Sequence, residues 1–216
     1  MLAAQFAFDM AASPEAAHMQ PRYNIAPTQP VAVVREHTVD GGRALHHLYW
    51  GLIPSWTKDP TIGNRMINAR GETVAEKPSF RTALRRRRCL ILADGFYEWA
   101  AGPEGKVPHH IHRIDGRPFA FAGLWEHWMG PNGEEITSCT IITTTANAQM
   151  TAVHRRMPVI LPEGEHARWL SRAETPPAKL LPLLAPRDWE GMTMHPVSTY
   201  VNNPRNEGPQ CTVPAP

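Results

Sequence analysis

Four short polar segments of this 216-residue chain carry side chains suited to acid–base chemistry or phosphate binding. The first is Ile67-Asn-Ala-Arg-Gly-Glu72. Alternate residues of an extended strand share a face, so Asn68, Arg70 and Glu72 would lie side by side. Arg70 could then hold a phosphate and Asn68 a substrate hydroxyl. A surface strand with an Arg–Glu ion pair is the alternative that the same pattern allows.

The second segment, Ala93-Asp-Gly-Phe-Tyr-Glu-Trp99, follows an apolar run. Glu98 lies between Tyr97 and Trp99, and an apolar setting raises the pKa of a carboxyl group towards neutrality. Such a group can act as a general acid or base. A glutamate that faces water from an edge strand fits this sequence equally well.

The third segment, Val153-His-Arg-Arg-Met-Pro-Val-Ile160, places His154 directly before Arg155 and Arg156. Neighbouring cations lower the pKa of a histidine, so we expect a neutral imidazole that can accept or shuttle a proton. A lone histidine is more often structural. The two arginines, which could clamp a phosphate, favour the functional interpretation.

The fourth segment is His195-Pro-Val-Ser-Thr-Tyr-Val-Asn-Asn203. Its histidine and asparagines could line a pocket or satisfy loop backbone, and we favour the structural role. The only dense histidine cluster is His109, His110 and His112. His110 and His112 would share a strand face, but no glutamate or third histidine follows at a suitable interval, so we expect no metal.

The three cysteines give no disulfide framework and no zinc site, because they are odd in number and widely spaced. Cys89 and Cys139 lie in apolar segments and look like core residues, while Cys211 lies in a proline-rich tail. None has the context of a nucleophile.

Short strands must position most of these residues. One domain over residues 1–216 is expected from the length and the lack of a linker, and the 22 prolines disfavour long helices. Strands are expected at 31–34, 45–50, 89–93, 108–114, 118–124 and 137–145, helices at 79–88 and 164–170, and turns at 41–42, 115–116 and 132–133. We therefore expect an α+β fold with a curved, mainly antiparallel, barrel-like sheet and helices packed outside it.

The net charge of +2 is too small to indicate nucleic-acid binding without local clustering. Clustering is present at Arg81 and residues 85–88, which form either a solvated helix face or a phosphate-binding surface. No apolar run reaches the roughly 20 residues that cross a bilayer, and no secretion signal is visible. We expect a soluble, cytoplasmic monomer without a cofactor.

Six segments together resemble the SOS-response-associated peptidase family, also described as abasic-site processing proteins. They are Arg22-Tyr-Asn-Ile-Ala-Pro27, Trp50-Gly-Leu-Ile-Pro-Ser-Trp56, Ile67-Asn-Ala-Arg-Gly-Glu72, Ala93-Asp-Gly-Phe-Tyr-Glu-Trp99, Val153-His-Arg-Arg-Met-Pro158 and His195-Pro-Val197. The segments occur in the family's order and span nearly the whole chain from Arg22 onwards, which makes the resemblance specific.

The resemblance implies a protein of the DNA damage response, associated with the nucleoid, that binds abasic sites in single-stranded DNA. It implies capture of the ring-opened aldehyde by the α-amine and thiol of an N-terminal cysteine, as a thiazolidine. An α-amine has a pKa of about 7.7–8.0, so part of it is nucleophilic at neutral pH. Asn68 would orient the sugar or amine, Glu98 would assist ring opening, and His154 would act on the imine or on reversal.

The same resemblance assigns contacts to the flanking DNA. Arg70, Arg155 and Arg156 would grip phosphates, and Trp56 and Trp99 would stack beside the lesion.

The chain departs from the family at its start, where the family begins Met-Cys-Gly-Arg-Phe. Here Leu2 follows Met1, and the first cysteine is Cys89. Leu2 and Phe6 share a helical face without a preceding cap, so we expect roughly a dozen family residues to be missing, by truncation, a misassigned start or natural loss. We expect DNA binding without crosslinking. The alternatives are a peptidase acting on other proteins, a non-catalytic DNA-binding module and, last, a metal-dependent barrel enzyme.

Overall fold

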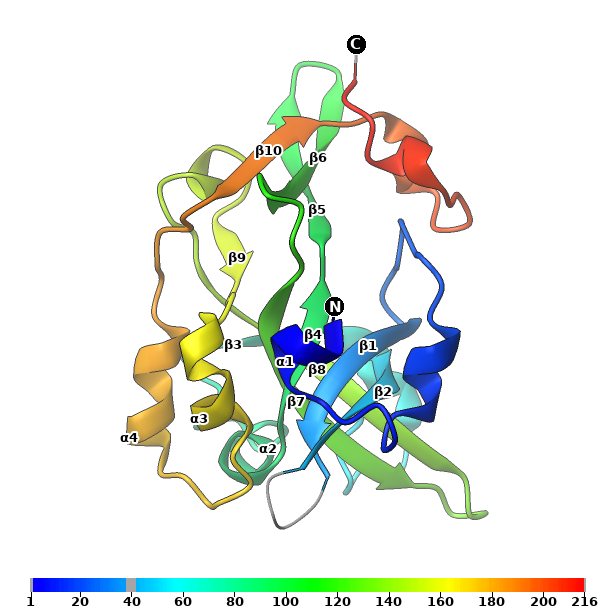
Figure 1. Ribbon diagram of the computed structural model, residues 1–216, viewed down its shortest axis with the longest axis vertical. Coiled ribbons are helices and arrows are strands. Elements are labelled where there is room, and N and C mark those ends of the chain that lie inside the picture. The colour runs from blue at the N-terminus through cyan, green and yellow to red at the C-terminus, as the bar shows by residue number, and fades with distance from the viewer. Residues whose placement is uncertain (1, 38–41, 216) are drawn as a thin grey trace.

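The computed structural model describes residues 2–37 and 42–215, and within this part of the chain seven strands form the larger of two sheets. These strands are β1 (Pro30–Glu36), β2 (Arg43–Trp50), β3 (Asn68–Arg70), β4 (Arg88–Ala93), β7 (Phe119–Met129), β8 (Glu135–Thr145) and β9 (Arg156–Pro158). Strands β2, β1, β4, β7 and β8 follow one another across the sheet, and β2 also pairs with β8. The sheet therefore closes on itself as a barrel (Figure 1).

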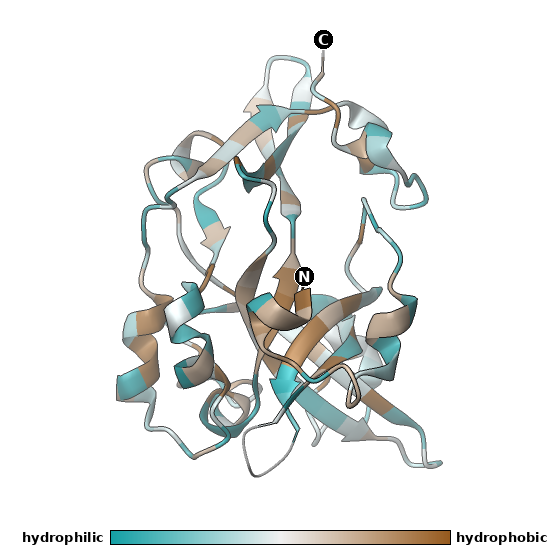
Figure 2. Cartoon of the chain, viewed as in Figure 1, coloured by the Kyte–Doolittle hydropathy of each residue, from teal (hydrophilic) through white to brown (hydrophobic). Residues whose placement is uncertain are grey.

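The barrel strands are rich in apolar and β-branched residues because they are covered on the side that faces the core. In β7, every residue from Phe119 to Leu124 is buried. Leu45, Leu90 and Ile142, from three other strands, are 0% exposed. Figure 2 shows hydrophobic residues concentrated on these strands. Each large side chain buried in this way stabilises the fold by about 1.5–3 kcal/mol.

Strand β8 pairs on both of its edges. One edge binds β7 antiparallel up to the pair Gly123–Ile141 and then β9 from the pair Thr143–Pro158. The other edge binds β2 and then β3, both in parallel. The expected curved, mainly antiparallel sheet is thus confirmed, and its two parallel pairings are those of β8 with β2 and β3. The short strands β3 and β9 lie on opposite edges of β8.

The second sheet contains β5 (Gly95–Gly102), β6 (Gly105–Arg113) and β10 (Met192–Pro196), in the order β10-β6-β5. Both pairings are antiparallel. Phe96 and the paired residue Ile111 pack into the hydrophobic core, where Phe96 makes edge contacts with Phe119 and Phe121 of the barrel. Because side chains alternate, Tyr97 and its partner His110 point to the opposite face.

The helices are short and lie outside the barrel (Figure 1). They are α1 (Leu2–Phe6), α2 (Arg81–Arg86), α3 (His166–Leu170) and α4 (Pro177–Leu180), with 3-10 turns η1 (Pro14–His18), η2 (Pro60–Arg65), η3 (Met150–Ala152), η4 (Glu163–Glu165), η5 (Leu181–Leu184), η6 (Thr199–Asn202) and η7 (Pro209–Cys211). Phe6 and Trp169 are fully buried, so α1 and α3 are anchored in the core. None of the helices in the described residues combines the length and the apolar character that crossing a membrane requires.

The expected strands and both glycine turns at 115–116 and 132–133 are present, and Gly116 and Gly133 adopt φ angles of 66° and 87°. The expected turn at 41–42 falls largely on residues 38–41, outside the described residues. The helix expected at 79–88 is shorter: Ser79 does not cap it, and Arg88 already belongs to β4.

Arg88 is not part of a solvated arginine face. Its side chain is buried, and its guanidinium donates hydrogen bonds to the carbonyls of Leu84 (2.7 Å), Trp169 (2.6 Å) and Ser171. These carbonyls lie near the ends of α2 and α3, where helical carbonyls lack partners. Burial lowers the pKa of Arg88 to about 10, which still leaves the group charged at neutral pH.

Replacing Arg88 with methionine is expected to lower the free energy of unfolding by about 2–4 kcal/mol, because several buried carbonyls lose their donor. Urea denaturation measures the change. Arg86→Met is the control, since Arg86 is exposed and pairs with an exposed Glu174; its loss should stay near about 0.5 kcal/mol. Equal losses in the two variants would contradict the role assigned to Arg88.

Candidate functional site

Glu98 of β5 meets His154, which precedes β9. Glu98 Oε1 lies 3.9 Å from His154 Nδ1. The imidazole is held from its own segment, because the backbone amide of Arg156 donates to His154 Nδ1 at 3.2 Å. The amide of His154 itself donates to the carbonyl of Met150 at 2.8 Å. Two residues that are 56 positions apart in the sequence thus lie side by side, a carboxyl group and an imidazole, and we refer to them as the acid–base pair.

Burial raises the pKa of Glu98, and the charges of His154 and Lys106 oppose this effect. The direction agrees with the expectation from its aromatic neighbours. A carboxyl group whose pKa is raised holds its proton closer to neutral pH, which suits it to give and take a proton at a substrate.

Glu72 and Arg156 form a bidentate ion pair beside this acid–base pair. Arg156 Nη1 and Nη2 lie 2.8 and 2.9 Å from the two carboxylate oxygens, and Nη2 also donates to the carbonyl of Thr143 at 2.8 Å. The hydrogen bonds from Arg156 lower the pKa of Glu72. The Arg–Glu pair considered for this segment therefore exists, but the arginine comes from β9 and not from Arg70.

Asn68 and Arg70 are exposed on either side of the buried Ala69, as the expected alternation requires. Asn68 pairs with Ile141 of β8 and Arg70 with Thr143, so both side chains lie on the face to which Arg156 is bonded. In the described residues no hydrogen bond joins Asn68 to Glu98 or His154. The structure thus places Asn68 on β3, across β8 from the strand that follows His154, and without a hydrogen bond to either residue.

Two of the predicted phosphate-binding arginines have free guanidinium groups. Arg70 and Arg155 are exposed, and within residues 2–37 and 42–215 neither has a side-chain hydrogen bond or ion pair. Arg156, in contrast, is engaged by Glu72.

The two predicted stacking residues, Trp56 and Trp99, also differ in whether their side chains are free. Trp56 is 61% exposed, in a loop after β2. The indole of Trp99 is half-buried and donates from Nε1 to Asn202 Oδ1 at 2.8 Å. Trp56 is therefore available as a stacking surface. Trp99 instead links the C-terminal segment, residues 198–211, to β5.

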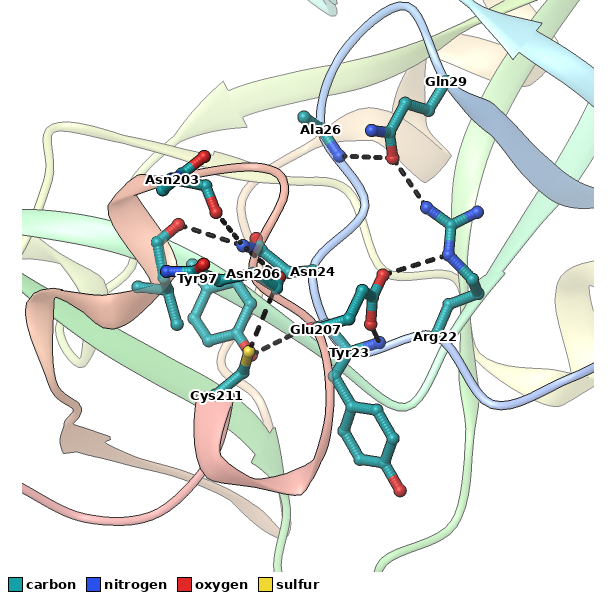
Figure 3. Close-up of polar contacts among 11 residues, drawn as sticks. Arg22, Tyr23, Asn24, Ala26, Gln29, Tyr97, Asn203, Asn206, Glu207 and Cys211 are labelled. Atoms are coloured by element: carbon teal, nitrogen blue, oxygen red, sulfur yellow. Dashed lines mark hydrogen bonds and ion pairs between the residues drawn. The ribbon is translucent and has the colours of Figure 1, made fainter.

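Asn24 is the anchor of that C-terminal segment, a role that sequence reasoning missed (Figure 3). The residue is 6% exposed, and its Nδ2 lies 3.1 Å from each of the carbonyl oxygens of Val201, Asn203 and Asn206. The sequence feature that could have revealed this role is the position of Asn24 in the family-like segment 22–27, to which the sequence reasoning assigned no chemistry. A buried amide donor organises a loop whose carbonyls would otherwise be unpaired.

Three further contacts complete this network (Figure 3). The Tyr97 hydroxyl donates to the carbonyl of Tyr23 at 2.7 Å. Glu207 accepts from the amide of Tyr23 at 2.8 Å and from Arg22 Nε at 3.0 Å. Because Tyr97 immediately precedes Glu98, the N-terminal loop and the C-terminal segment together fix the strand that carries the acid–base pair.

The histidine and cysteine expectations have different outcomes. His195 Nε2 lies 2.9 Å from the carbonyl of Thr212, in agreement with a backbone-satisfying role. No third histidine lies at a suitable sequence interval from His110 and His112, but β10 brings His195 to them in space. The expectation that no metal binds stays a prediction. All three cysteines are buried, and burial raises their thiol pKa values, so none is an available nucleophile.

Comparison with known proteins gives consistent matches over most of the chain. A family model described as SOS response associated peptidase (SRAP) matches residues 1–204. The chain is 46% identical over 192 residues to the abasic site processing protein YoqW of Bacillus subtilis (strain 168), covering 88% of this chain and 84% of that protein. It is 35% identical over 226 residues to the abasic site processing protein HMCES of Gallus gallus, covering 90% of this chain and 66% of that protein.

Solved structures share the fold. A crystal structure of a protein from Bacteroides thetaiotaomicron matches with a TM-score of 0.76 and 30% identity, covering 90% of this chain and 82% of that chain. A second, of a protein from Bordetella bronchiseptica, matches with a TM-score of 0.71 and 29% identity, covering 81% of this chain and 86% of that chain.

Replacing Asn24 with aspartate is expected to lower the free energy of unfolding by about 2–4 kcal/mol, because an acceptor then faces three carbonyls. Urea denaturation measures this loss, and proteolysis should first cut residues 198–211. Asn64→Asp is the matched control: Asn64 is exposed and accepts from the Tyr49 hydroxyl, which aspartate can also do. A comparable loss in the control would show that Asn24 has no special role.

Replacing Glu98 with glutamine is expected to raise the free energy of unfolding at neutral pH. Folding raises the pKa of Glu98, so the parent chain loses stability as the pH rises through the folded-state value. Glutamine cannot ionise, and the difference should vanish below about pH 4, where the carboxyl is protonated in both states. Urea titrations across this pH range test the expectation, with the exposed Glu104→Gln as control. A difference that grows towards acid would overturn it.

Proposed function

The chain belongs to the SOS response associated peptidase (SRAP) family, and on this premise we propose that it recognises abasic sites in single-stranded DNA and processes them at Glu98 and His154. The observation that carries the proposal is the approach of Glu98 to His154, at 3.9 Å. Asn68 and Arg70 lie on β3, across β8 from the strand β9 that follows His154. Because abasic sites occur in DNA, the proposed function requires the protein to be present where the cell keeps its DNA.

The chemistry of an abasic site explains why such a pair is useful. The sugar is a cyclic hemiacetal, and its opening to the reactive aldehyde moves a proton from the hydroxyl to the ring oxygen. A carboxyl group with a raised pKa can carry that proton, and the adjacent imidazole can exchange it. The Asn68 amide offers both a donor and an acceptor to the open sugar.

The contacts to the DNA backbone are assigned to the free cations. Arg70 and Arg155 are exposed and unpaired in the described residues, and both can reach phosphates without breaking an existing ion pair. Arg156 is instead proposed to position the segment of His154 by its bidentate bond to Glu72. The exposed Trp56 offers a face on which a neighbouring base can stack.

The family resemblance attributes covalent capture to an N-terminal cysteine, whereas the cysteines of this sequence are Cys89, Cys139 and Cys211. Their thiols are buried and have raised pKa values. We therefore propose that none of these three thiols crosslinks to abasic DNA. The same buried thiols weigh against cysteine-dependent cleavage of other proteins.

Binding to abasic and intact single strands of one sequence, measured over a salt series, tests this proposal. The abasic strand should bind more tightly, and Arg70→Ala should weaken binding and reduce the salt slope by about 1. Arg117→Ala is the control, because Arg117 is exposed but paired with Glu163. Equal affinity for the two strands would indicate a DNA-binding module without lesion recognition.

A denaturing gel after incubation with the abasic strand tests the second half of the proposal. No shifted band that depends on these three buried thiols is expected. A shifted band that disappears when the three cysteines are replaced with serine would contradict the proposal.

A further inference from the structure

Two neighbouring strands of the second sheet bring three histidines together. His110 and His112 lie two residues apart on β6 and therefore share a face. His195 of β10 pairs directly with His110. One ring nitrogen from each of the three lies within 4.8 Å of the others. In the described residues this is the one group of three or more potential ligands that lie so close.

Backbone carbonyls lie within hydrogen-bond distance of one ring nitrogen in two of the three histidines. His112 Nδ1 lies 3.0 Å from the carbonyl of Arg113, and His195 Nε2 lies 2.9 Å from the carbonyl of Thr212. A ring nitrogen that donates to a carbonyl fixes the tautomer and leaves the lone pair of the other nitrogen free.

The third ring, that of His110, has a buried Nδ1 without any hydrogen-bond partner among the described residues. An unpaired buried nitrogen costs free energy, and an ion drawn into the group would give this ring a partner. The absence of a side chain at Gly95 makes room for the ring, since a Cβ there would lie 2.2 Å from His110 Nε2.

The histidine group is separate from the acid–base pair. Along β5 and β6, Tyr97 and His110 form one pair and Glu98 and His109 the next, so the two sites point to opposite faces of the same sheet. The three histidines are half-buried, which leaves access for an ion and for a solvent ligand. Failure of either site in an experiment would therefore say nothing against the other.

We propose that His110, His112 and His195 bind one divalent transition-metal ion of the zinc class, with solvent in the fourth position. Three imidazoles without a carboxylate suit zinc, whereas calcium and magnesium require oxygen ligands. Tetrahedral zinc with bonds of about 2.0–2.1 Å needs ligand nitrogens about 3.3 Å apart, so the rings must close by small side-chain rotations. The ion would join β10 to β6 and so stabilise the adjoining C-terminal segment.

Isothermal titration of the metal-free protein with Zn²⁺, after removal of any affinity tag, tests the site. One ion per chain is expected. His110→Phe and His112→Phe keep a ring for packing but remove a ligand, and each should weaken binding by more than about 100-fold, beyond the 10–100-fold loss typical of ligand-supporting groups. His109→Phe is the matched control on the same strand, and it should bind zinc like the parent.

Two further measurements keep the test independent of any variant that folds poorly. Zinc at about 100 times its Kd should raise the Tm of the parent by roughly 5–10 °C. Co²⁺ should give the intense visible absorption of a four-coordinate site in the parent. Absence of zinc binding by the folded parent, a Co²⁺ spectrum without these bands, or equal binding by His112→Phe and His109→Phe would overturn the proposal.

Discussion

The pairing of β8 on both edges is the constraint from which the arrangement of the site follows. A central strand must satisfy the amide and carbonyl groups of both edges, and neither edge of β8 is paired with one strand over its whole length. One edge passes from β7 to β9, and the other from β2 to β3. The two short strands that carry Asn68, Arg70 and Arg156 are held in place because β8 needs them as partners.

The alternation of side chains then separates two kinds of chemistry on one small sheet. Glu98 points towards the segment of His154, while Tyr97 and His110 point towards the C-terminal segment. A single strand of eight residues, β5, therefore supports the proposed DNA site on one face and borders the histidine group on the other. The rigidity of such a strand comes from its neighbours, since isolated hairpins are only marginally stable.

Buried polar groups hold the irregular parts of the chain against this framework. Arg88 donates hydrogen bonds to carbonyls near the ends of two helices, and Asn24 donates to carbonyls of the C-terminal segment. Short helices and proline-rich loops leave many backbone groups unpaired, and one well-placed donor can satisfy several of them. In this protein the side chains of an arginine and an asparagine supply donors to carbonyls that would be paired with backbone amides in longer helices.

The sequence by itself determined the strands, the α+β class and the family resemblance, because these depend on local pattern and on neighbouring residues. It left open whether Glu98 is buried with a raised pKa or faces water, and the structure decided for burial. It did not determine that Glu72 pairs with Arg156, that Arg88 is buried, or that His195 joins His110 and His112. Only the tertiary structure decided these, because each depends on which distant strand lies alongside, and sheet pairing is a long-range choice that local periodicity does not encode.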